Sequence, residues 1–476
     1  MNAPPSIVWL RRDLRLADNP ALFAAAESGP VIPVFILDPV IDTEIGAAQR
    51  LRLKASLSAL GGAFAKAGAP FILRRGPALQ TLLRLIDETG AKAVRWNRLT
   101  DGASLARDSE VKAALKARGV EAESHCGLTL LDPWRVRTAA GEAYKVFTPF
   151  HRAFVKHAVP APLPRPALKG TARVISDDLA DWRLDAPMGP AAEALASGFH
   201  VGEEAALDRL DDWLAGPAAQ YAGRRDRLDS AEATTGLSEY LALGEISPRT
   251  VWAALDRAGG DAGAEAARRQ LVWRDFAHAL LFDDPEIERE NWRRAWSAFP
   301  WLGDNAAAEA WRRGETGCDL IDAAMRELWV TGRMHNRARM LVGSYLTKHL
   351  LTHWRVGEAH FRDTLIDWDP ANNAMGWQWV AGSGPDAAPF FRIFNPDSQA
   401  KRFDPDGVYR RRWLEGPGAE TFRAMRPKHH RAEAPSGRPP PIVELGFGRK
   451  RALEAWAAMR DKSDAVKATG VRESTT

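Results

Sequence analysis

The sequence predicts an α/β domain with a doubly wound parallel sheet, followed by a large all-helical domain. Two observations predict this architecture. Short apolar, β-rich runs alternate with amphipathic helical segments over about the first 125 residues, as in domains with a parallel sheet. After about Gly202 the Ala, Leu, Arg and Trp residues recur with helical spacing. With 476 residues the chain is long enough for two or three cores, since single cores rarely exceed roughly 250–300 residues.

The predicted strands are short apolar runs of the kind that is buried on both faces of a sheet. They are Ser6–Leu10, Val31–Leu37, Pro70–Arg75 and Ala91–Asn97. The clearest helix between them is Ala47–Ala67, whose leucines recur near helical spacing. No G-x-G-x-x-G follows the first run, so no nucleotide is predicted from that motif, although a ligand at the carboxyl ends of the strands stays open.

Composition divides the chain into three parts. Residues 1–130 form the predicted α/β domain and residues 131–201 a linker, in which the Pro-rich stretch Val159–Gly170 should be extended and exposed. Residues 202–476 form the predicted helical domain. The division places most of the polar and aromatic motifs in the helical part.

Charge and cysteine content exclude several classes of protein. The formal net charge is only +4, yet arginines cluster at 224–225 and 410–412, which indicates a local docking face for an anion or ordinary solvated surface. Cys126 and Cys318 have no metal-binding or disulfide-framework spacing, so no metal site is expected. No secretory signal and no long apolar run is visible, and we expect a soluble cytoplasmic protein without membrane contact.

Two segments of the helical part combine polar groups in a way that suits a ligand. The stretch Thr234–Ser238 follows basic residues and offers hydroxyl and N–H groups for a pyrophosphate at a helix start, although a plain helix cap explains it as well. Gln270, Trp273 and Arg274 are spaced to share one helix face, which suits a base-sized pocket.

A second helical stripe holds Asn336, Arg339 and Met340 at the same spacing. The alternative for this stripe is that Met340 belongs to the core and Asn336 is an exposed amide. Neither alternative is excluded by the spacing alone.

The stretch Leu365–Pro396 is the densest in polar and aromatic residues. Asp369 precedes Pro370 as an N-cap precedes the first helical position, which predicts that a helix begins there. From that start Asp369, Asn373 and Trp377 fall on one stripe, while Trp379 points roughly 200° away from Trp377. The helix therefore presents different side chains to two neighbours.

Seven motifs, in order along residues 6 to about 460, resemble the photolyase/cryptochrome flavoproteins. They are WLRRDLRLADNPAL, YKVFTPF, TTGLS, YLALGEISPR, QLVWRDF, TGCDLIDAAMRELWVTGRMHNRARM and LIDWDPANN…WQW…FFRIFNP. The variants look most like bacterial photolyases for cyclobutane pyrimidine dimers, especially class III. The resemblance implies light-driven electron transfer from a reduced FAD to a dimer flipped out of DNA, without a metal.

The resemblance also implies which residues hold the FAD. Asp367 matches an acid paired with Arg339 near the isoalloxazine, and Asn373 the residue that faces flavin N5. An Asn there favours repair over signalling, because plant cryptochromes commonly carry Asp. The full set of cofactor positions is Tyr221, Thr234, Thr235, Gly236, Leu237, Ser238, Arg274, Asn336, Arg339, Asp367, Asp369 and Asn373.

Electron transfer and lesion binding follow from the same matching. Trp377, Trp354 and Trp301 match a chain of three tryptophans that passes electrons to photo-oxidised flavin. The expected lesion contacts are Gln270, Trp273, Asn336, Arg337, Met340 and Trp379, with the two indoles flanking the dimer. The branch of the family that repairs (6-4) lesions carries His at the two positions where this chain has Asn336 and Met340. Gln270 stands where dimer photolyases typically carry Glu, which keeps a (6-4) substrate open as an alternative.

The expected partner is damaged double-stranded DNA, and also single-stranded DNA, bound by a monomer. The main alternative of another class is a cryptochrome photoreceptor with the same flavin fold. An antenna chromophore is expected in the α/β domain, with methenyltetrahydrofolate favoured over 8-hydroxy-deazaflavin. Ser104 stands where some members carry a Glu that contacts the folate.

Overall fold

The computed structural model describes residues 3–171, 174–189, 191–386, 391–425 and 439–468 of the chain. The chain forms two compact units, each built from several segments. Unit 1 comprises residues 1–225, 231–285 and 362–372, and unit 2 comprises residues 226–230, 286–361 and 373–476. Each unit is described by itself below.

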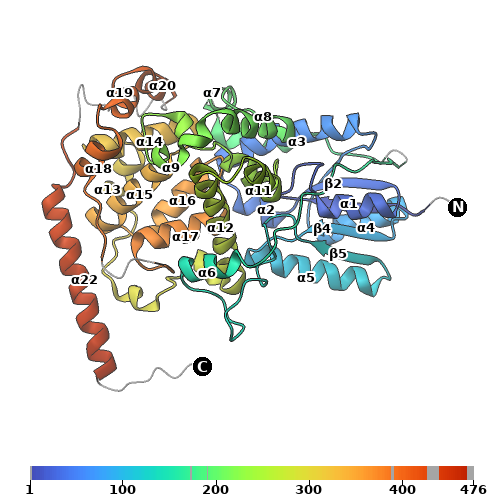
Figure 1. Cartoon of the computed structure of the whole chain (residues 1–476), viewed down its shortest axis with the longest axis horizontal. Coiled ribbons are helices and arrows are strands. Elements are labelled where there is room, and N and C mark those ends of the chain that lie inside the picture. Colours follow the sequence, from blue (N-terminus) through green and yellow to red (C-terminus); the bar gives the residue numbers. More distant parts are fainter. Residues whose placement is uncertain (1–2, 172–173, 190, 387–390, 426–438, 469–476) are drawn as a thin grey trace. The chain divides into compact units, whose positions relative to one another are not determined.

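Unit 1 contains a parallel sheet of five strands in the order β3-β2-β1-β4-β5, visible in Figure 1. The strands are β1 (Ser6–Leu10), β2 (Val31–Leu37), β3 (Ile72–Arg75), β4 (Ala93–Asn97) and β5 (Glu121–His125). In β1, Ser6 pairs in register with Val31 of β2 on one side and with Ala93 of β4 on the other. The predicted doubly wound sheet is confirmed. The sequence EAESH of β5 has no apolar run, and only Ala122 is buried, so this edge strand escaped prediction.

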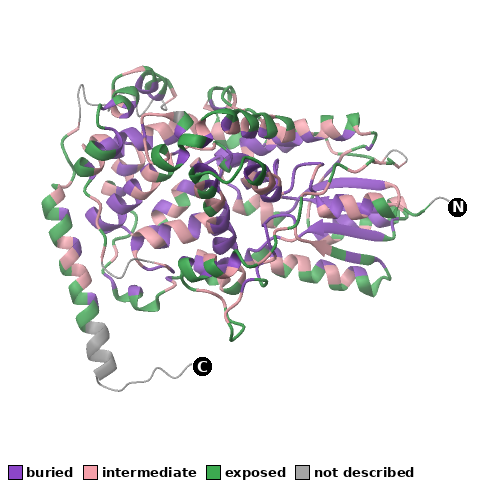
Figure 2. Ribbon diagram, viewed as in Figure 1, coloured by how far each residue is buried: buried purple, intermediate pink, exposed green. Residues whose placement is uncertain are grey.

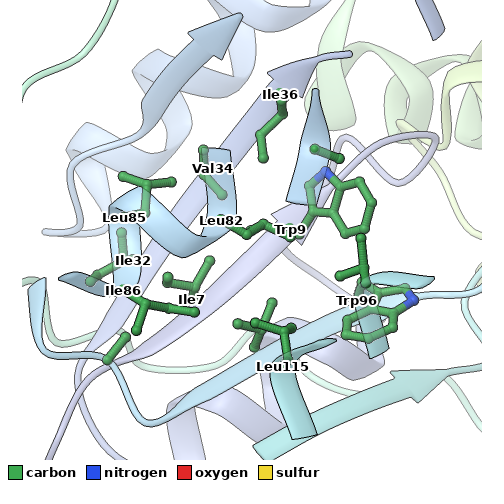
Figure 3. Close-up of a cluster of buried hydrophobic side chains, with 14 of the residues drawn as sticks. Ile7, Trp9, Ile32, Val34, Ile36, Leu82, Leu85, Ile86, Trp96 and Leu115 are labelled. Carbon is green, nitrogen blue, oxygen red and sulfur yellow. The ribbon is translucent and has the colours of Figure 1, made fainter. Parts of the chain in front are cut away.

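Alternate residues of the strands build the core on one face of the sheet. Ile7 and Trp9 of β1 point to the same side as Ile32, Val34 and Ile36 of β2. There they pack against buried side chains of two helices that follow in the chain: Leu82, Leu85, Ile86, Val111 and Leu115. Figure 3 shows this cluster. Burying these apolar side chains fixes the sheet, and with it the loops at the carboxyl ends of the strands.

Helices surround the sheet and continue beyond it in unit 1. They are α1 (Pro20–Ser28), α2 (Pro39–Glu44), α3 (Ala47–Lys66), α4 (Ala78–Thr89), α5 (Gly102–Ala117), α6 (Phe147–Phe154), α7 (Ala191–Ala196), α8 (Gly202–Ala215), α9 (Tyr221–Arg224), α10 (Ser238–Leu243), α11 (Pro248–Arg257) and α12 (Ala262–Asp283), with 3-10 turns η1 (Leu179–Trp182), η2 (Ala186–Met188), η3 (Pro217–Gln220) and η4 (Ala231–Ala233). The helix predicted at Ala47–Ala67 is α3. Residues 159–169 have no regular secondary structure and are at least partly exposed, as the proline content predicts.

The regular secondary structure of unit 2 is helical within its described residues, apart from one isolated bridge between Leu302 and Thr352. Its elements are η6 (Arg294–Ala298), α13 (Ala306–Arg312), α14 (Asp319–Thr331), α15 (Asn336–Ser344), η7 (Tyr345–His349), α18 (Pro396–Phe403), α19 (Val408–Leu414), α20 (Pro417–Met425) and α22 (Leu445–Ala468). The turn η5 (Pro285–Glu288) and the helices α16 (Trp354–Thr364) and α17 (Pro370–Ala381) contribute residues to both units. Figure 2 shows buried and exposed residues alternating along several of the helices, as in amphipathic helices of a globular domain, whereas η7 is buried throughout.

Candidate functional site

The loop before α10 leads into a helix start in unit 1, and the N–H of Leu237 donates to Thr235 Oγ1 at 3.3 Å within it. Arg209 binds it from one side, because its Nε donates to the carbonyl of Thr235 at 2.8 Å and its Nη2 to that of Thr234 at 3.1 Å. Gly236 has φ +68°, and a Cβ there would lie 2.6 Å from Arg209 Nε, so only glycine fits. Within the described contacts no side chain caps α10, and Ser238 is exposed. The loop can therefore offer N–H groups to an anion.

Two further residues of the expected cofactor set are buried in unit 1. Tyr221 packs edge-on against Trp213, with ring centroids 5.3 Å apart. Arg274 donates to the carbonyls of Leu128 at 2.6 Å and Leu241 at 3.5 Å, and burial lowers the pKa of its guanidinium. Its contacts in unit 1 thus tie α12 to two neighbouring segments.

Asp369 combines a helix cap with a buried charge cluster. Its Oδ1 accepts from the backbone N–H of Asn372 at 2.9 Å, which confirms the predicted start of α17. Its Oδ2 lies 3.3 Å from His278 Nε2 and 3.6 Å from Arg12 Nη1. Burial alone would raise the pKa of Asp369, but His278, Arg274 and Arg12 together hold it well below the ordinary value. Asp369 is therefore a carboxylate at any physiological pH.

His278 is the uncharged member of this cluster. Burial lowers its pKa, and its Nδ1 lies 2.7 Å from the hydroxyl of Thr100. A neutral imidazole whose Nδ1 accepts from Thr100 carries its proton on Nε2, toward Asp369. Thr100 and His278 thus orient one oxygen of Asp369, and the helix cap orients the other.

Asn373 of α17 is fixed by Glu358 of α16 in unit 2. The Asn373 Nδ2 donates to Glu358 Oε1 at 2.8 Å and to the Glu358 carbonyl at 3.3 Å. Glutamate and carbonyl oxygens are acceptors, so this pairing fixes which end of the carboxamide carries the NH2 group. Among the described residues none donates to Asn373 Oδ1, which leaves that oxygen for another donor.

The three tryptophans of the expected electron chain lie along α16 in unit 2. Trp354 begins α16, is fully buried and donates from Nε1 to Asn291 Oδ1 at 2.9 Å. Trp377 packs against Gly357 of the same helix, where a Cβ would lie only 2.0 Å from the indole. At the other end Trp301, which is partly exposed, contacts His353 with centroids 5.2 Å apart. The order from buried to exposed suits a path toward solvent.

Trp273 of α12 lies in a stack of rings in unit 1. Its indole is parallel to Phe147, with centroids 3.5 Å apart and planes 7° apart. Arg269 lies 4.8 Å from the centroid of Phe147, and Phe276 meets Trp273 edge-on at 5.9 Å. Gln270, one turn earlier on α12, donates only weakly to the carbonyl of Ala266 at 3.4 Å. Phe147 thus covers one face of Trp273, and Gln270 has an amide available for a ligand.

The second stripe lies on α15 in unit 2. Asn336 is exposed, and its Nδ2 lies 3.9 Å from the sulfur of Met340. Arg337 pairs with Asp226 at 2.6 Å, and Arg339 donates to the carbonyl of Met334 at 2.7 Å. Met340 is only partly buried, so it is not a core methionine. Asp367, the expected partner of Arg339, belongs to unit 1, and this pair stays a prediction.

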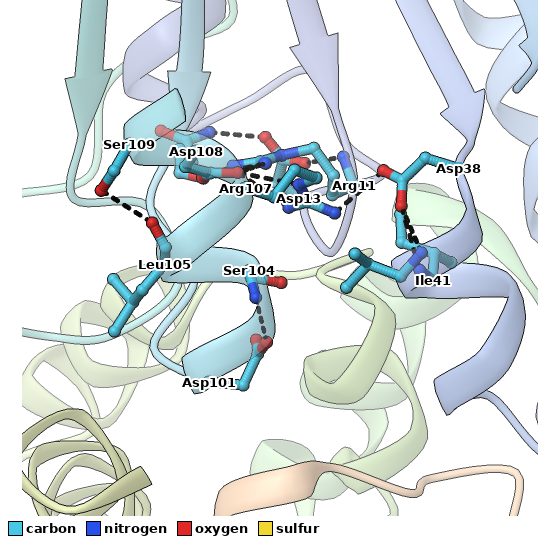
Figure 4. A network of polar contacts seen from close by, with 12 residues as sticks. Arg11, Asp13, Asp38, Ile41, Asp101, Ser104, Leu105, Arg107, Asp108 and Ser109 are labelled. Carbon is cyan, nitrogen blue, oxygen red and sulfur yellow. Dashed lines mark hydrogen bonds and ion pairs between the residues drawn. The ribbon is translucent and has the colours of Figure 1, made fainter. Parts of the chain in front are cut away.

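A network of charged side chains fills the carboxyl ends of β1, β2 and β4, shown in Figure 4. Arg11 pairs with Asp108 at 3.1 Å, and Arg107 pairs with Asp38 at 2.9 Å and with Asp108 at 2.8 Å. Asp101 accepts from the backbone N–H of Ser104, which is buried in the first turn of α5. Most of these groups pair with one another, in the place where a doubly wound domain binds its ligand, while the buried Nε of Arg11 has no hydrogen-bond partner among the described residues.

The described residues include no group of three or more His, Cys, Asp or Glu that could hold a metal ion. Within the same residues, no helix is long and apolar enough to span a bilayer.

Two family models match the chain. The model described as DNA photolyase matches residues 6–167, and the model described as FAD binding domain of DNA photolyase matches residues 267–458. The chain belongs to the photolyase/cryptochrome family. The family and the fold predicted from the seven motifs are thereby confirmed, and the second match shows an FAD-binding domain.

Full-length relatives agree with the family match. A deoxyribodipyrimidine photo-lyase of Agrobacterium fabrum is 43% identical over 97% of this chain and 99% of its own length. Cryptochrome-1 of Arabidopsis thaliana is 34% identical over 95% of this chain but only 70% of its own length. The crystal structure of a class III photolyase from Agrobacterium tumefaciens matches with a TM-score of 0.88 and 42% identity, over 97% of this chain and 98% of that one.

The residues present fit an FAD. The uncapped start of α10 and the open loop before it can take the pyrophosphate. The oxygen of Asn373, which accepts nothing from the described residues, can take an N–H of the flavin ring.

Sequence reasoning missed two residues of these sites and one buried lysine of unit 2. Glu358 and Asn373 are 15 residues apart on different helices, so no local pattern joins them. Phe147 lies in the YKVFTPF motif, which indicated the family but not the stack with Trp273. The third is Lys348, a lysine inside an apolar run, where a charge is unexpected.

Proposed function

We propose that this chain repairs cyclobutane pyrimidine dimers in DNA with blue light, as a deoxyribodipyrimidine photo-lyase. The observation that carries the proposal is the likeness to a deoxyribodipyrimidine photo-lyase over nearly the whole of both chains. The match to the plant cryptochrome covers a smaller part of that protein. Asn373 adds a physical reason, because a neutral amide can bind a ring N–H without supplying a proton.

The roles of the chain's residues in this function follow from their contacts. A bound FAD in its reduced form supplies the electron that light transfers to the dimer. Asn373, held by Glu358, presents an acceptor oxygen of fixed orientation. Asp369 keeps a negative charge beside the start of α17, where the positive end of the helix dipole stabilises it.

Lesion binding is assigned to the two indoles and the polar groups beside them. Trp273, held flat by Phe147, offers its other face to an extruded pyrimidine, and Trp379 offers the second indole. Gln270 and Asn336 supply amides for the pyrimidine edges, and Met340 supplies an apolar contact. Arg337 is partly exposed beside them for backbone phosphate.

The remaining cofactor positions have supporting parts in this proposal. The pyrophosphate is held by the loop of Thr234, Thr235, Gly236, Leu237 and Ser238, and Tyr221 and Arg274 support this loop. Arg339 and Asp367 form the ion pair beside the flavin ring. Trp377, Trp354 and Trp301 restore a reduced flavin by passing electrons from solvent, which repair itself does not require.

The proposal also includes a folate antenna, monomeric binding of double-stranded and single-stranded DNA, and a cytoplasmic location. Methenyltetrahydrofolate is favoured over 8-hydroxy-deazaflavin by the class III likeness. Extraction of bound chromophores, with absorbance spectra against both standards, tests this part.

The central experiment mixes reduced protein with a dimer-containing oligonucleotide under blue light and follows the recovery of thymine absorbance. Recovery that depends on light supports repair, and its absence with flavin-loaded, reduced protein contradicts it. A parallel oligonucleotide with a (6-4) lesion tests the alternative that Gln270 leaves open.

A Trp377→Phe variant separates the electron chain from repair. It should abolish photoreduction of oxidised flavin, while pre-reduced variant still repairs dimers at close to the wild-type rate. Loss of both activities would contradict the role given to Trp377.

A further inference from the structure

The three tryptophans of the expected electron chain differ in what their indole N–H groups contact. Trp377 Nε1 is buried and has no hydrogen-bond acceptor among the described residues. Trp354 Nε1 donates to Asn291 Oδ1 at 2.9 Å, and Trp301 Nε1 donates to the carbonyl of Trp296 at 3.0 Å. An indole that loses an electron becomes a radical cation, and a hydrogen-bond acceptor at its N–H stabilises this positive charge. The contacts therefore favour a positive charge on the two outer tryptophans over one on Trp377.

The contact between Asn291 and Trp354 is enclosed by protein. Asn291 is 5% exposed and Trp354 is 0% exposed, so water does not compete for the indole N–H. On the other side of the carboxamide, Asn291 Nδ2 lies 3.5 Å from the hydroxyl oxygen of Ser297. An indole N–H can only donate, so the oxygen of the carboxamide is the atom that faces Trp354. Asn291 thus offers Trp354 a neutral acceptor of fixed orientation.

The segment that carries Asn291 lies between the turns η5 and η6 and is fixed by Gln378 of α17. The Nε2 of this fully buried glutamine donates to the carbonyl of Glu290 at 2.8 Å, and its Oε1 accepts from the N–H of Trp292 at 2.8 Å. These two bonds hold the residues on either side of Asn291. Because Gln378 directly follows Trp377 in the chain, the helix that carries the first tryptophan also positions the acceptor for the second.

The charged groups around Trp354 give a positive charge on its indole little support. The guanidinium carbon of Arg355 lies 6.0 Å from the centre of the Trp354 ring, and its charge repels a second positive charge. Glu290 pairs with Arg355 at 2.8 Å, which offsets the guanidinium charge in part. Burial lowers the pKa of His353, whose ring lies 5.5 Å from that of Trp354, to about 4, so this imidazole is uncharged at neutral pH. Stabilisation of an oxidised Trp354 therefore depends on its hydrogen bond to Asn291.

The outer step of the chain, from Trp354 to Trp301, is fixed by backbone contacts. The N–H of His353 donates to the carbonyl of Leu302 at 2.9 Å, and the N–H of Leu302 donates to the carbonyl of Leu351 at 2.8 Å. These bonds hold the residue after Trp301 against the residues before Trp354. The His353 ring contacts both indoles, with centroids 5.2 Å from Trp301 and 5.5 Å from Trp354. An electron vacancy that is stabilised on Trp354 thus has a preformed way to the partly exposed Trp301.

We propose that Asn291 is a positioning residue of the electron chain, which stabilises the radical cation of Trp354 and leaves its Nε1 proton in place. This inference rests on the electron chain of the proposed function. Trp377 loses one electron to the light-excited, oxidised FAD, Trp354 gives one electron to the Trp377 radical cation, and Trp301 gives one electron to the Trp354 radical cation. A neutral amide accepts the hydrogen bond without taking the proton, so Trp354 returns to its starting form. Asn291 therefore favours outward transfer over return of the electron to Trp377.

The first experiment excites the protein loaded with oxidised FAD by a short blue flash and follows the tryptophan radicals by their absorption. In Asn291→Leu the yield of the long-lived radical on Trp301, per bound FAD, should fall about fivefold or more, because a hydrogen bond to a charged group is lost. Asn305→Leu is the matched control in the same unit. It removes an asparagine that only caps α13, with 2.9 Å from its Oδ1 to the N–H of Ala307, and should keep the wild-type yield. An unchanged yield in Asn291→Leu overturns the inference.

Asn291→Asp keeps the shape of the side chain and tests the proton. Its carboxylate should take the Nε1 proton of oxidised Trp354, so the radical there becomes neutral, absorbs at shorter wavelength than the cation and forms more slowly in D2O. The wild type should form the radical cation on Trp354 without this isotope effect. This experiment decides the question if Asn291→Leu does not fold. If Asn291→Asp and the wild type give the same radicals, Asn291 controls neither the charge nor the proton of Trp354, and the inference is overturned.

Failure of the inference and failure of the proposed function give different results. Repair needs no electron from the tryptophans when the protein is reduced beforehand, so repair by the pre-reduced wild type is measured separately on dimer-containing DNA. If the wild type repairs dimers and Asn291→Leu keeps the wild-type radical yield, the inference alone is overturned. If the wild type does not repair dimers while Asn291→Leu lowers the radical yield, the proposed function is contradicted and the role of Asn291 is supported.

Discussion

Asp369 in unit 1 and Lys348 in unit 2 are both buried charged residues, and their surroundings are opposite. Asp369 lies 3.6 Å from Arg12 Nη1 and 3.3 Å from Nε2 of the neutral His278, and it caps a helix, so its charge is stabilised from several directions. Lys348 has a carbonyl and two aromatic rings around it, and among the described residues no carboxylate lies within ion-pair distance of its ammonium. A buried charge that has partners is stabilised where it lies, whereas one that has few of them costs free energy as long as it stays ionised.

The contributions of Asp369 and Lys348 to stability should change with pH in different ranges. The pKa of Asp369 is lowered, so its contribution to stability is present above its ordinary value of 3.8 and is lost as the pH falls below it. Lys348 is a base with a lowered pKa, so the unfolded chain binds the proton more tightly. Its cost is full at low pH and disappears as the pH rises toward 10.5.

The largest effect is expected for Asp369→Ala. This change removes the helix cap and leaves Arg12 and Arg274 without their shared counter-charge, so unfolding free energy should fall by about 3–5 kcal/mol. Urea unfolding at neutral pH measures it. Asp369→Asn is the matched control, because Asn also caps helices well and loses only the charge. If the two variants lose the same stability, the helix cap contributes nothing.

Lys348→Met should have a smaller effect, visible mainly as a change in pH dependence. As the pH rises toward 10.5 the wild type should gain stability relative to the variant, because the unfolded chain keeps the Lys348 proton over a pH range in which the folded protein has lost it. Urea unfolding of both proteins across this range measures the difference. Parallel curves would mean that Lys348 keeps an ordinary pKa and is not buried as a charge.

The two residues also differ in how far the sequence predicted them. Asp369 was predicted as an N-cap because Asp before Pro at a helix start is a local signal, and its hydrogen bond to Asn372 confirms it. Four strands and their alternation with helices along the chain were also predictable from local signals, because short apolar runs alternate with helical ones. The edge strand β5 gave no such signal.

Lys348 could not be predicted because its surroundings come from distant parts of the chain. Trp296, Ala381 and Phe391 are between 33 and 52 residues away in the sequence, and spacing says nothing of their contact. The same holds for Glu358 with Asn373 and for Phe147 with Trp273. Local patterns predict helix starts and faces, whereas the partners of buried polar groups depend on tertiary packing.

The smallest effect is expected for Thr100, which tests whether Asp369 depends on neutral His278. Thr100→Val keeps the shape but leaves Nδ1 of His278 without its donor, so stability should fall by about 1 kcal/mol. Thr100→Ser keeps the hydroxyl and is the matched control. Because valine removes the group that favours a proton on Nε2, the His278 ring should lose its single tautomer, which nitrogen-15 NMR of the imidazole can detect. An unchanged tautomer would show that Asp369 alone orients His278, and the cluster would then depend on its charges rather than on the hydroxyl.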